Sequence, residues 1–221
     1  MSDLYGIAAQ TTSRVSVAEG GNARLRALRD ASLITANWYE SMALAGRIVG
    51  ANFGTVTTPL TFLVTAANRP DAWVRVPDGT AILPLSCNIV LETSAGTATE
   101  IDIRTAQNDI GNGTSTAASV GPQSLRGDSL FTSGCTARQL ATADTTAETS
   151  PISVYRKTFG PISDTTTPGG LDRSVMITRE MMGYPVLIGA ATWEAFIAAT
   201  TTQATGFVIM TWLELPESFV T

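Results

Sequence analysis

The longest alternation of apolar and polar residues in the chain lies in the stretch VRVPDGTAILPLSCNIVLE, residues 74–92. Its second half is apolar at every second position, namely Leu83, Leu85, Cys87, Ile89 and Leu91. This alternation predicts a half-buried β-strand with these five side chains on one face. Pro77-Asp78-Gly79, just before it, combines three residue types that favour tight turns. The stretch therefore predicts a strand, a turn and a second strand.

From Arg47 onward, short apolar runs alternate with turn residues at fairly regular spacing, and no long segment has helical periodicity. Such runs, eight to ten of which predict strands, begin at residues 47, 58, 72, 81, 100, 152, 174, 184, 192 and 206. Many short strands at this spacing are typical of an antiparallel sandwich or barrel. The last run, Phe207 to Leu215, is apolar on both faces until Glu214, so we expect it to lie centrally in its sheet.

Residues 1–46 have a different pattern, and we interpret them as an arm that precedes a main domain of residues 47–221. Part of the arm has apolar residues at helical spacing, namely Ile34, Trp38, Met42 and Ala45, and Asn22 could cap the start of this helix. The same stretch contains β-branched and aromatic residues that also suit an extended segment. Val15 and Val17 could add a short strand.

A stretch at about 104–150 is dominated by Thr, Ser, Ala and Gly. A loop of this length inside a domain usually marks a functional or intersubunit insertion. The pattern of the whole chain thus predicts an all-β protein, an antiparallel sandwich with an N-terminal arm that includes a helix and with a long insertion.

Composition adds an expectation about the surface. Charged residues make up only 15% of the chain, against roughly 25% in typical soluble domains, so much of the surface must be Thr, Ser, Ala and Gly. This favours large areas of contact with neighbouring molecules, although a single-domain protein with a Thr-rich surface fits as well.

The net charge of −5 and the scattered arginines argue against strong direct binding of nucleic acid, which needs clustered Lys and Arg. The nearest cluster is Arg24, Arg26 and Arg29, which we interpret as a solvated face.

The absence of histidine removes the commonest general base and the commonest metal ligand, and two cysteines alone cannot form a standard zinc site. Glu100 and Asp102 share one strand face at roughly 7 Å, a spacing that two-carboxylate hydrolysis could use. We instead expect two solvent-facing acids, with Ile101 and Ile103 inward. The sequence thus predicts no enzyme, no catalytic residues, no metal site and no cofactor.

Four further features carry weak signals. Asn108 to Gly113 offers oxygen ligands and could hold calcium near Asp109, but it lacks the full spacing of a calcium loop. Arg126-Gly127-Asp128 matches a cell-adhesion tripeptide yet is also ordinary turn sequence, and Lys157 has no glycine-rich phosphate loop around it. Cys87 and Cys135 are expected to be unpaired thiols, with a disulfide as the alternative.

No stretch reaches the roughly 18 apolar residues of a membrane span, and the first residues lack the pattern of a signal peptide. We therefore expect synthesis in the cytoplasm and no membrane span.

The stretches VRVPDGTAILPLSCNIVLE and GFVIMTWLELP together resemble, by strand pattern over roughly residues 47–216, the single jelly-roll structural proteins of virus particles. The resemblance implies a jelly-roll capsid protein that self-assembles into the particle shell, together with other virion proteins, and it implies no small-molecule substrate. The lack of a basic arm favours a DNA-containing particle, with a bacteriophage as the source. The protein would be made in the host cytoplasm and located in the virion.

A receptor- or glycan-binding β-domain of a phage fibre or spike is the alternative. Sugar-binding domains use exposed aromatic rings as stacking platforms, and Trp73, Trp193 and Trp212 are the candidates here. Each lies in an apolar run, so we expect all three in the core.

Overall fold

A computed structural model describes residues 38–55, 57–63, 69–93, 98–108, 118–128, 131–140, 149–159, 174–199 and 203–220. The chain divides into two compact units, residues 1–41 and 42–221. Of the first unit, the described residues are Trp38–Ser41, which begin the single described α-helix, α1 (Trp38–Leu44). Several predicted features lie outside the described residues. They are the rest of the predicted helix, its cap at Asn22, the short strand at Val15 and Val17, and Arg24, Arg26 and Arg29.

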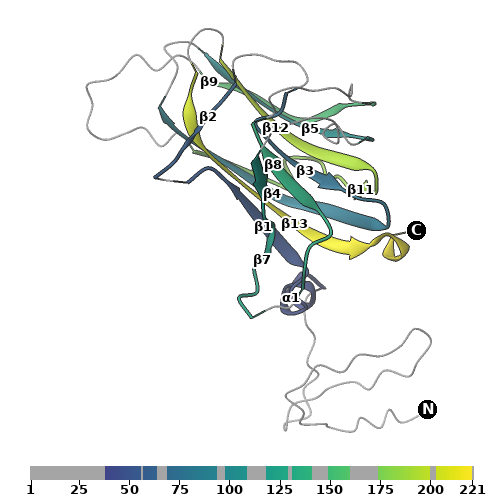
Figure 1. Ribbon diagram of the computed structural model, residues 1–221. Coiled ribbons are helices and arrows are strands. Elements are labelled where there is room, and N and C mark those ends of the chain that lie inside the picture. Colours follow the sequence, from purple (N-terminus) through teal and green to yellow (C-terminus); the bar gives the residue numbers. More distant parts are fainter. Residues whose placement is uncertain are drawn as a thin grey trace, which may run out of the picture. The chain divides into compact units, whose positions relative to one another are not determined.

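The second unit is an antiparallel β-sandwich (Figure 1). One sheet, called the first sheet, has the strand order β10-β4-β13-β1-β7, with β11 beside β4 and β2 beside β13. Its strands are β1 (Ile48–Phe53), β2 (Leu60–Thr61), β4 (Thr80–Thr93), β7 (Gln123–Ser124), β10 (Ser174–Thr178), β11 (Leu187–Ile188) and β13 (Thr205–Pro216). A short 3-10 helix, η1 (Glu217–Phe219), follows β13.

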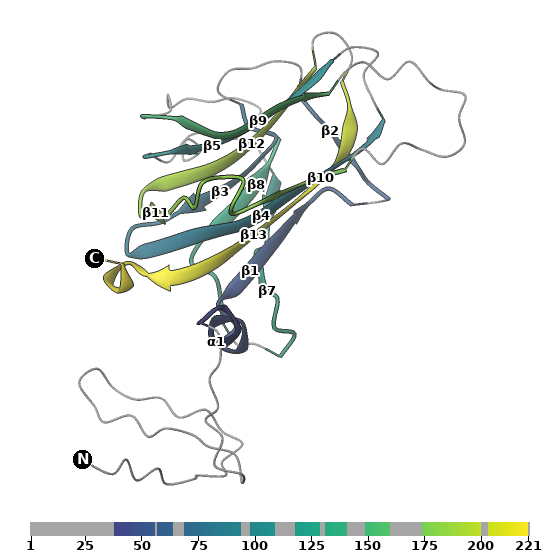
Figure 2. The same cartoon turned by 180° about the vertical axis from the view of Figure 1, so that it is seen from behind.

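The second sheet has the strand order β6-β8-β3-β12-β5-β9. Its strands are β3 (Ala72–Val76), β5 (Thr99–Ala106), β6 (Ala118–Val120), β8 (Thr136–Gln139), β9 (Ile152–Phe159) and β12 (Ala191–Ala199). The view from behind shows the two sheets stacked as layers, with η1 beside the starts of β4 and β11 (Figure 2).

The all-β fold and the predicted strands are confirmed in the described residues. Each of the ten apolar runs contains a strand, although β2 and β11 are reduced to two residues each. The final run forms β13, which is bonded to β4 on one side and to β1 on the other, as its two apolar faces predict. The insertion at about 104–150 is not one loop, because β6, β7 and β8 lie within it and extend both sheets.

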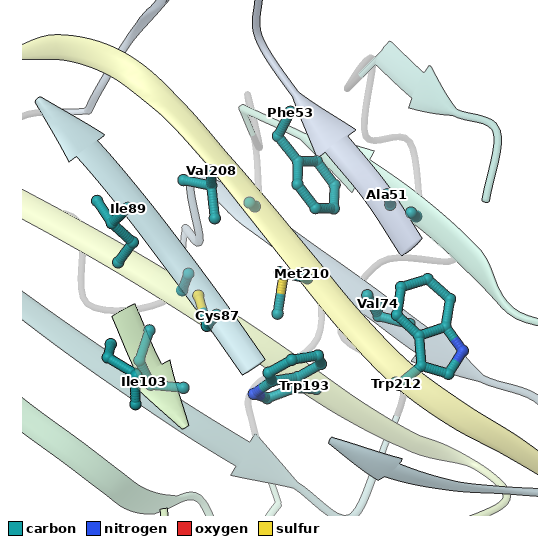
Figure 3. Packing of buried hydrophobic residues seen from close by; sticks show 14 of the residues in the cluster. Ala51, Phe53, Val74, Cys87, Ile89, Ile103, Trp193, Val208, Met210 and Trp212 are labelled. Atoms are coloured by element: carbon teal, nitrogen blue, oxygen red, sulfur yellow. The ribbon is translucent and has the colours of Figure 1, made fainter. Parts of the chain in front are cut away.

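Inward side chains of the two sheets form one core (Figure 3). Val208 and Met210 from β13 and Cys87 from β4 are fully buried and face the second sheet, whose Trp193 and Ile103 are also fully buried. The alternation of inward and outward side chains along each strand places these residues on the inner faces.

The prediction that five alternating residues of residues 83–91 share one face is wrong. Cys87, Ile89 and Leu91 point into the core, whereas Leu83 and Leu85 belong to a separate cluster on the opposite face. The pairing between β4 and β13 shifts at this point, from Thr211 opposite Ser86 to Trp212 opposite Pro84. Leu85 is thus an extra residue, a β-bulge, and such a bulge reverses the faces of the residues before it.

Gly206 in β13 supports a prediction about close packing. A Cβ at residue 206 would lie 2.0 Å from the carbonyl oxygen of Val90, whereas one at Gly121 would meet nothing within 4 Å. We expect Gly206→Ala to lower the free energy of unfolding by roughly 2–3 kcal/mol, because backbone of a central strand pair must move. Gly121→Ala should change it by less than about 0.5 kcal/mol. Urea unfolding of both variants tests this, and equal effects would contradict it.

Candidate functional site

The two carboxylates proposed for two-acid chemistry are held in ion pairs. Asp102 is 4% exposed, and its carboxylate accepts hydrogen bonds from Arg104 Nε at 2.7 Å and from Ser153 Oγ at 2.6 Å. Glu100 accepts from Arg156. The expectation that both acids face solvent is therefore wrong for Asp102, because side chains of β5 and β9 cover it. Ile101 and Ile103 are fully buried, as predicted.

The three tryptophans proposed as sugar platforms are in the interior. Trp73, Trp193 and Trp212 are each at most 1% exposed. Stacking on a sugar needs an accessible ring face, so these residues cannot act as platforms in this structure. The prediction that they belong to the core is confirmed.

The proposed calcium loop can be followed only at its first residue, because residues 109–117 lie outside the described residues. Asn108 Oδ1 accepts a hydrogen bond from the amide of Thr149 at 2.6 Å, and its main-chain oxygen accepts from Thr192 Oγ1 at 2.5 Å. These bonds fix the two ends of the insertion against β12. Among the described residues, no group of three or more acidic, Cys or His side chains is placed to bind a metal ion.

The Arg126-Gly127-Asp128 tripeptide forms a turn whose charged groups bind each other. Arg126 Nε donates to Asp128 Oδ1 at 2.7 Å, and the same guanidinium also donates to the main-chain oxygen of Leu44. The tripeptide thus ties the insertion to the end of α1. Lys157, the other candidate basic group, extends its Nζ over the Phe159 ring at 4.8 Å.

Cys87 and Cys135 are both free and both buried, as the sequence predicted. Burial raises the pKa of Cys87 to about 12. Burial and the nearby Glu214 carboxylate raise the pKa of Cys135 as well. A thiol reacts as its thiolate, so neither cysteine is prepared for nucleophilic chemistry.

Glu214 organises the polar neighbourhood of Cys135. It is 4% exposed, and its carboxylate accepts hydrogen bonds from Ser133 Oγ at 2.5 Å, the amide of Gly134 at 2.7 Å and Trp212 Nε1 at 3.4 Å. These bonds attach residues 133–135 to the central strand β13. The arrangement provides this buried carboxyl group with several hydrogen-bond donors, as a buried polar group requires.

The buried thiols predict a labelling result. In the native protein at pH 8, a thiol reagent should modify neither cysteine at an appreciable rate, because both are buried and protonated. In denaturant both should react within minutes. Mass spectrometry after timed alkylation measures this, and rapid single labelling of the native protein would show that one thiol is accessible.

Asp71 is a buried acid that the pattern of apolar runs did not single out. It is 2% exposed, and its two carboxylate oxygens accept hydrogen bonds from the amides of Leu63 and Ile197, each at 2.7 Å. Its own amide donates to Ala195, and its main-chain oxygen accepts from Leu140. Asp71 therefore joins the segment after β2 to β12 and to the end of β8. In the sequence, only its position directly before the apolar run 72–76 indicates that Asp71 is buried.

Asp71 predicts a pH dependence of stability. Burial raises the pKa of its carboxyl from 3.8 to about 7, although both backbone amides oppose this shift. The folded state then keeps a proton between pH 4 and 7 that the unfolded state has lost. The free energy of unfolding should therefore fall as pH rises through this window, by on the order of 2–4 kcal/mol, and level off above it.

Asp71→Asn, which is neutral at every pH, should remove this slope, even if the variant is less stable throughout. Urea unfolding at intervals from pH 4 to 8 measures the slope. The exposed Asp128→Asn is the matched control and should retain it. A wild-type protein whose stability rises between pH 4 and 7 would contradict the assignment.

A second hydrophobic cluster lies on the outward face of the first sheet. Its buried members are Leu83, Leu213 and Leu215, and Met42, Ile48 and Leu85 pack against them. Met42 belongs to the last turn of α1, so the end of the predicted arm covers the outer face of the sheet. Ser124 Oγ, which donates to the main-chain oxygen of Gly46 at 2.8 Å, fixes the chain as it enters β1.

The described residues also leave twelve large apolar side chains exposed. They are Trp38, Tyr39, Leu44, Leu125, Ile152, Met176, Met181, Tyr184, Val186, Ile188, Phe219 and Val220. Single exposed apolar residues are ordinary, but gathered ones mark contact surfaces.

No family model, curated protein or solved structure matches the chain. Among the described residues, no helix has the length and hydrophobicity needed to cross a membrane.

Proposed function

We propose that the protein is a structural subunit of a virus particle, a jelly-roll capsid protein that self-assembles into the shell. The observation that carries the proposal is the way the long strands alternate between the two sheets. The low content of charged residues, the exposed apolar residues and the packing of the end of the arm on the first sheet support it further.

A jelly roll is a sandwich of eight strands wound as two Greek keys. The eight described strands of five or more residues are β1, β3, β4, β5, β9, β10, β12 and β13. In chain order, β1 lies in the first sheet, β3 in the second and β4 in the first. β5 and β9 lie in the second sheet, β10 in the first, β12 in the second and β13 in the first. The neighbours are β10-β4-β13-β1 in one sheet and β3-β12-β5-β9 in the other, all antiparallel. This order supports the proposal, because strands adjacent in sequence mostly fall in opposite sheets in a jelly roll.

Fold alone does not determine function, so the surface must support the proposal as well. The chain has few charged residues and exposes apolar side chains on several elements, which suits a subunit in contact with many neighbours. The glycan-binding alternative is weakened, because its three proposed tryptophans are buried.

The arm provides the test. Residues 1–37 contain Leu25, Leu28 and Ile34, more apolar surface than a free tail favours in water. If they dock on neighbouring subunits, deletion of residues 1–37 should leave a folded domain that no longer forms the higher assembly. Negative-stain microscopy of the full chain should show closed particles or capsomers, and light scattering after size exclusion should show a smaller species for the deletion variant.

A second deletion, of residues 1–46, serves as the matched comparison. It also removes Met42, which covers Leu213 and Leu215, so its sandwich should be less stable than that of the shorter deletion. An unchanged assembly from the shorter deletion would refute the docking arm. A full chain that stays a monomer at all concentrations and binds glycans on an array would refute the shell proposal.

A further inference from the structure

The strand β9 is a long edge of the second sheet. The strand orders of the two sheets end at β10, β7, β6 and β9, which have five, two, three and eight residues. Among the described residues, no strand pairs with the outer side of β9 (Figure 2). The main-chain amides and carbonyls of an open edge are available for pairing with another chain. Short edges limit such pairing by their length, whereas β9 is long enough to accept a full strand.

The composition of β9 favours pairing as well. Four of its eight residues are apolar β-branched or aromatic types that are typical of strands, namely Ile152, Val154, Tyr155 and Phe159. Ile152 is 58% exposed, and the other three pack against the core cluster. A long, exposed and apolar edge strand is a site of association between chains unless another feature of the strand opposes it.

Lys157 lies on the inner face of this strand. Its partner on β5 is Ile101, which is fully buried in the core, and cross-strand partners share a face. Tyr155 and Phe159, two residues to either side of Lys157, pack against the same core. Lys157 itself is exposed, because β9 is the last strand of its sheet. A charged group therefore lies on the face of the strand that is otherwise apolar.

The choice of lysine for this position makes enclosure costly. The chain has thirteen arginines and a single lysine. A guanidinium group is weakly hydrated and is often buried or stacked, whereas an ammonium group is compact and strongly hydrated. The Lys157 Nζ lies 4.8 Å from the centre of the Phe159 ring, an arrangement that leaves the side chain exposed. Removal of its remaining water by a neighbouring chain would carry a large desolvation cost.

Pairing with another strand would bring other groups against this charge. A strand added at the edge would place its own inward side chains about 5 Å from that of Lys157. If the added strand is β9 of a second copy, antiparallel pairing about a two-fold axis at Arg156 sets two arginines opposite each other, and an axis at Lys157 does the same with two lysines. Like charges directly opposite each other are destabilising.

A bulge in β9 acts in the same direction. Ile103 of β5 pairs with Tyr155, but the next residue, Arg104, pairs with Ser153, so Val154 is an extra residue without a partner. A bulge increases the local twist and interrupts the regular spacing of main-chain groups that a second strand would need. Bulges and inward-pointing charges are two devices by which native proteins keep open edges unpaired.

We propose that Lys157, together with the bulge at Val154, prevents the β9 edge from pairing with strands of other copies of this chain. The inference goes beyond the proposed function and does not depend on it, since an open edge needs this protection in a single subunit as well as in a shell. If the chain assembles, the contacts between its copies lie elsewhere than at the β9 edge.

Replacement of the charged group by an apolar one tests the proposal. Lys157→Val in the full chain should associate at a protein concentration at least tenfold lower than the wild type, because valine makes the inner face of β9 continuously apolar. The net charge changes from −5 to −6, so repulsion between copies acts against this result and cannot produce it. Sedimentation velocity over a concentration series measures the association, and a far-ultraviolet spectrum checks that the fold is retained.

Two variants of the same strand are matched controls. Thr158→Val places the same side chain on the outer face, opposite Glu100, and keeps Lys157, so it should shift the association concentration less than twofold. Lys157→Glu exchanges one inward charge for another and should also stay within twofold of the wild type. An unchanged Lys157→Val, or association of either control at the concentration found for Lys157→Val, would overturn the proposal.

Hydrogen exchange locates the contact. When Lys157→Val associates, the β9 amides that face away from β5 should exchange at least tenfold more slowly than in the dissociated variant, because pairing protects them. Association without this protection would show that another surface is responsible and would overturn the proposal.

The same measurement on the wild type separates this inference from the shell proposal. Assembled wild-type protein should exchange these amides as fast as the unassembled chain. Their protection on assembly would overturn the inference about β9 and leave self-assembly standing. A wild type that never assembles, combined with association of Lys157→Val through β9, would overturn the shell proposal and support the inference.

Discussion

The structure depends on the packing of β13 against the second sheet. β13 is hydrogen-bonded on both sides, to β4 along its whole length and to β1 along six residues, and its inward side chains Val208, Met210 and Trp212 are fully buried. The buried Trp193 of β12 faces them across the core (Figure 3). Because this one strand supports both of its neighbours and closes the core, the other features follow its position. The outer cluster with Met42, the Glu214 bonds and the exposed turn η1 are all attached to it.

The sequence pattern was sufficient to predict the strands of the ten apolar runs and most of the core, but not β6, β7 and β8 in the insertion. Alternation identifies a strand wherever one face is buried, and an apolar run on both faces correctly indicated that β13 is central. Alternation failed where the partner strand decides the register. Leu83 and Cys87 point to opposite faces of the sheet because the pairing with β13 shifts between them. The residues of β4 alone do not specify this shift.

Polar residues of the interior were harder to predict for a related reason. Asp102 was expected to face solvent, because it alternates with Ile101 and Ile103, and that assignment of faces is correct. Its burial comes from Arg104 and Ser153, and the position of Ser153 depends on the pairing of β5 with β9 across an insertion of more than forty residues. Asp71 likewise acquires its partners from residues 63 and 197, which no local pattern connects.

The exposed apolar surface shows the same limit. Composition predicted large contact areas but could not locate them, since exposed apolar residues such as Ile152 and Ile188, which line one groove, come together only through the winding of the strands between the two sheets. Exposed apolar residues carry no periodic signal of their own. A surface assembled from distant segments becomes visible only when the fold is known.

The bulge in β4 has a consequence for how this chain can change over evolutionary time. One strand contributes Leu83 and Leu85 to the outer cluster and Cys87, Ile89 and Leu91 to the core, and Leu85, the extra residue, makes the two contributions compatible. Loss of a residue between Pro84 and Cys87 would restore simple alternation and turn one of these two sets toward the wrong side. Exchange of one residue type for another leaves both sets where they are. This segment is therefore expected to diverge freely in residue identity among descendants of the chain while its length stays fixed.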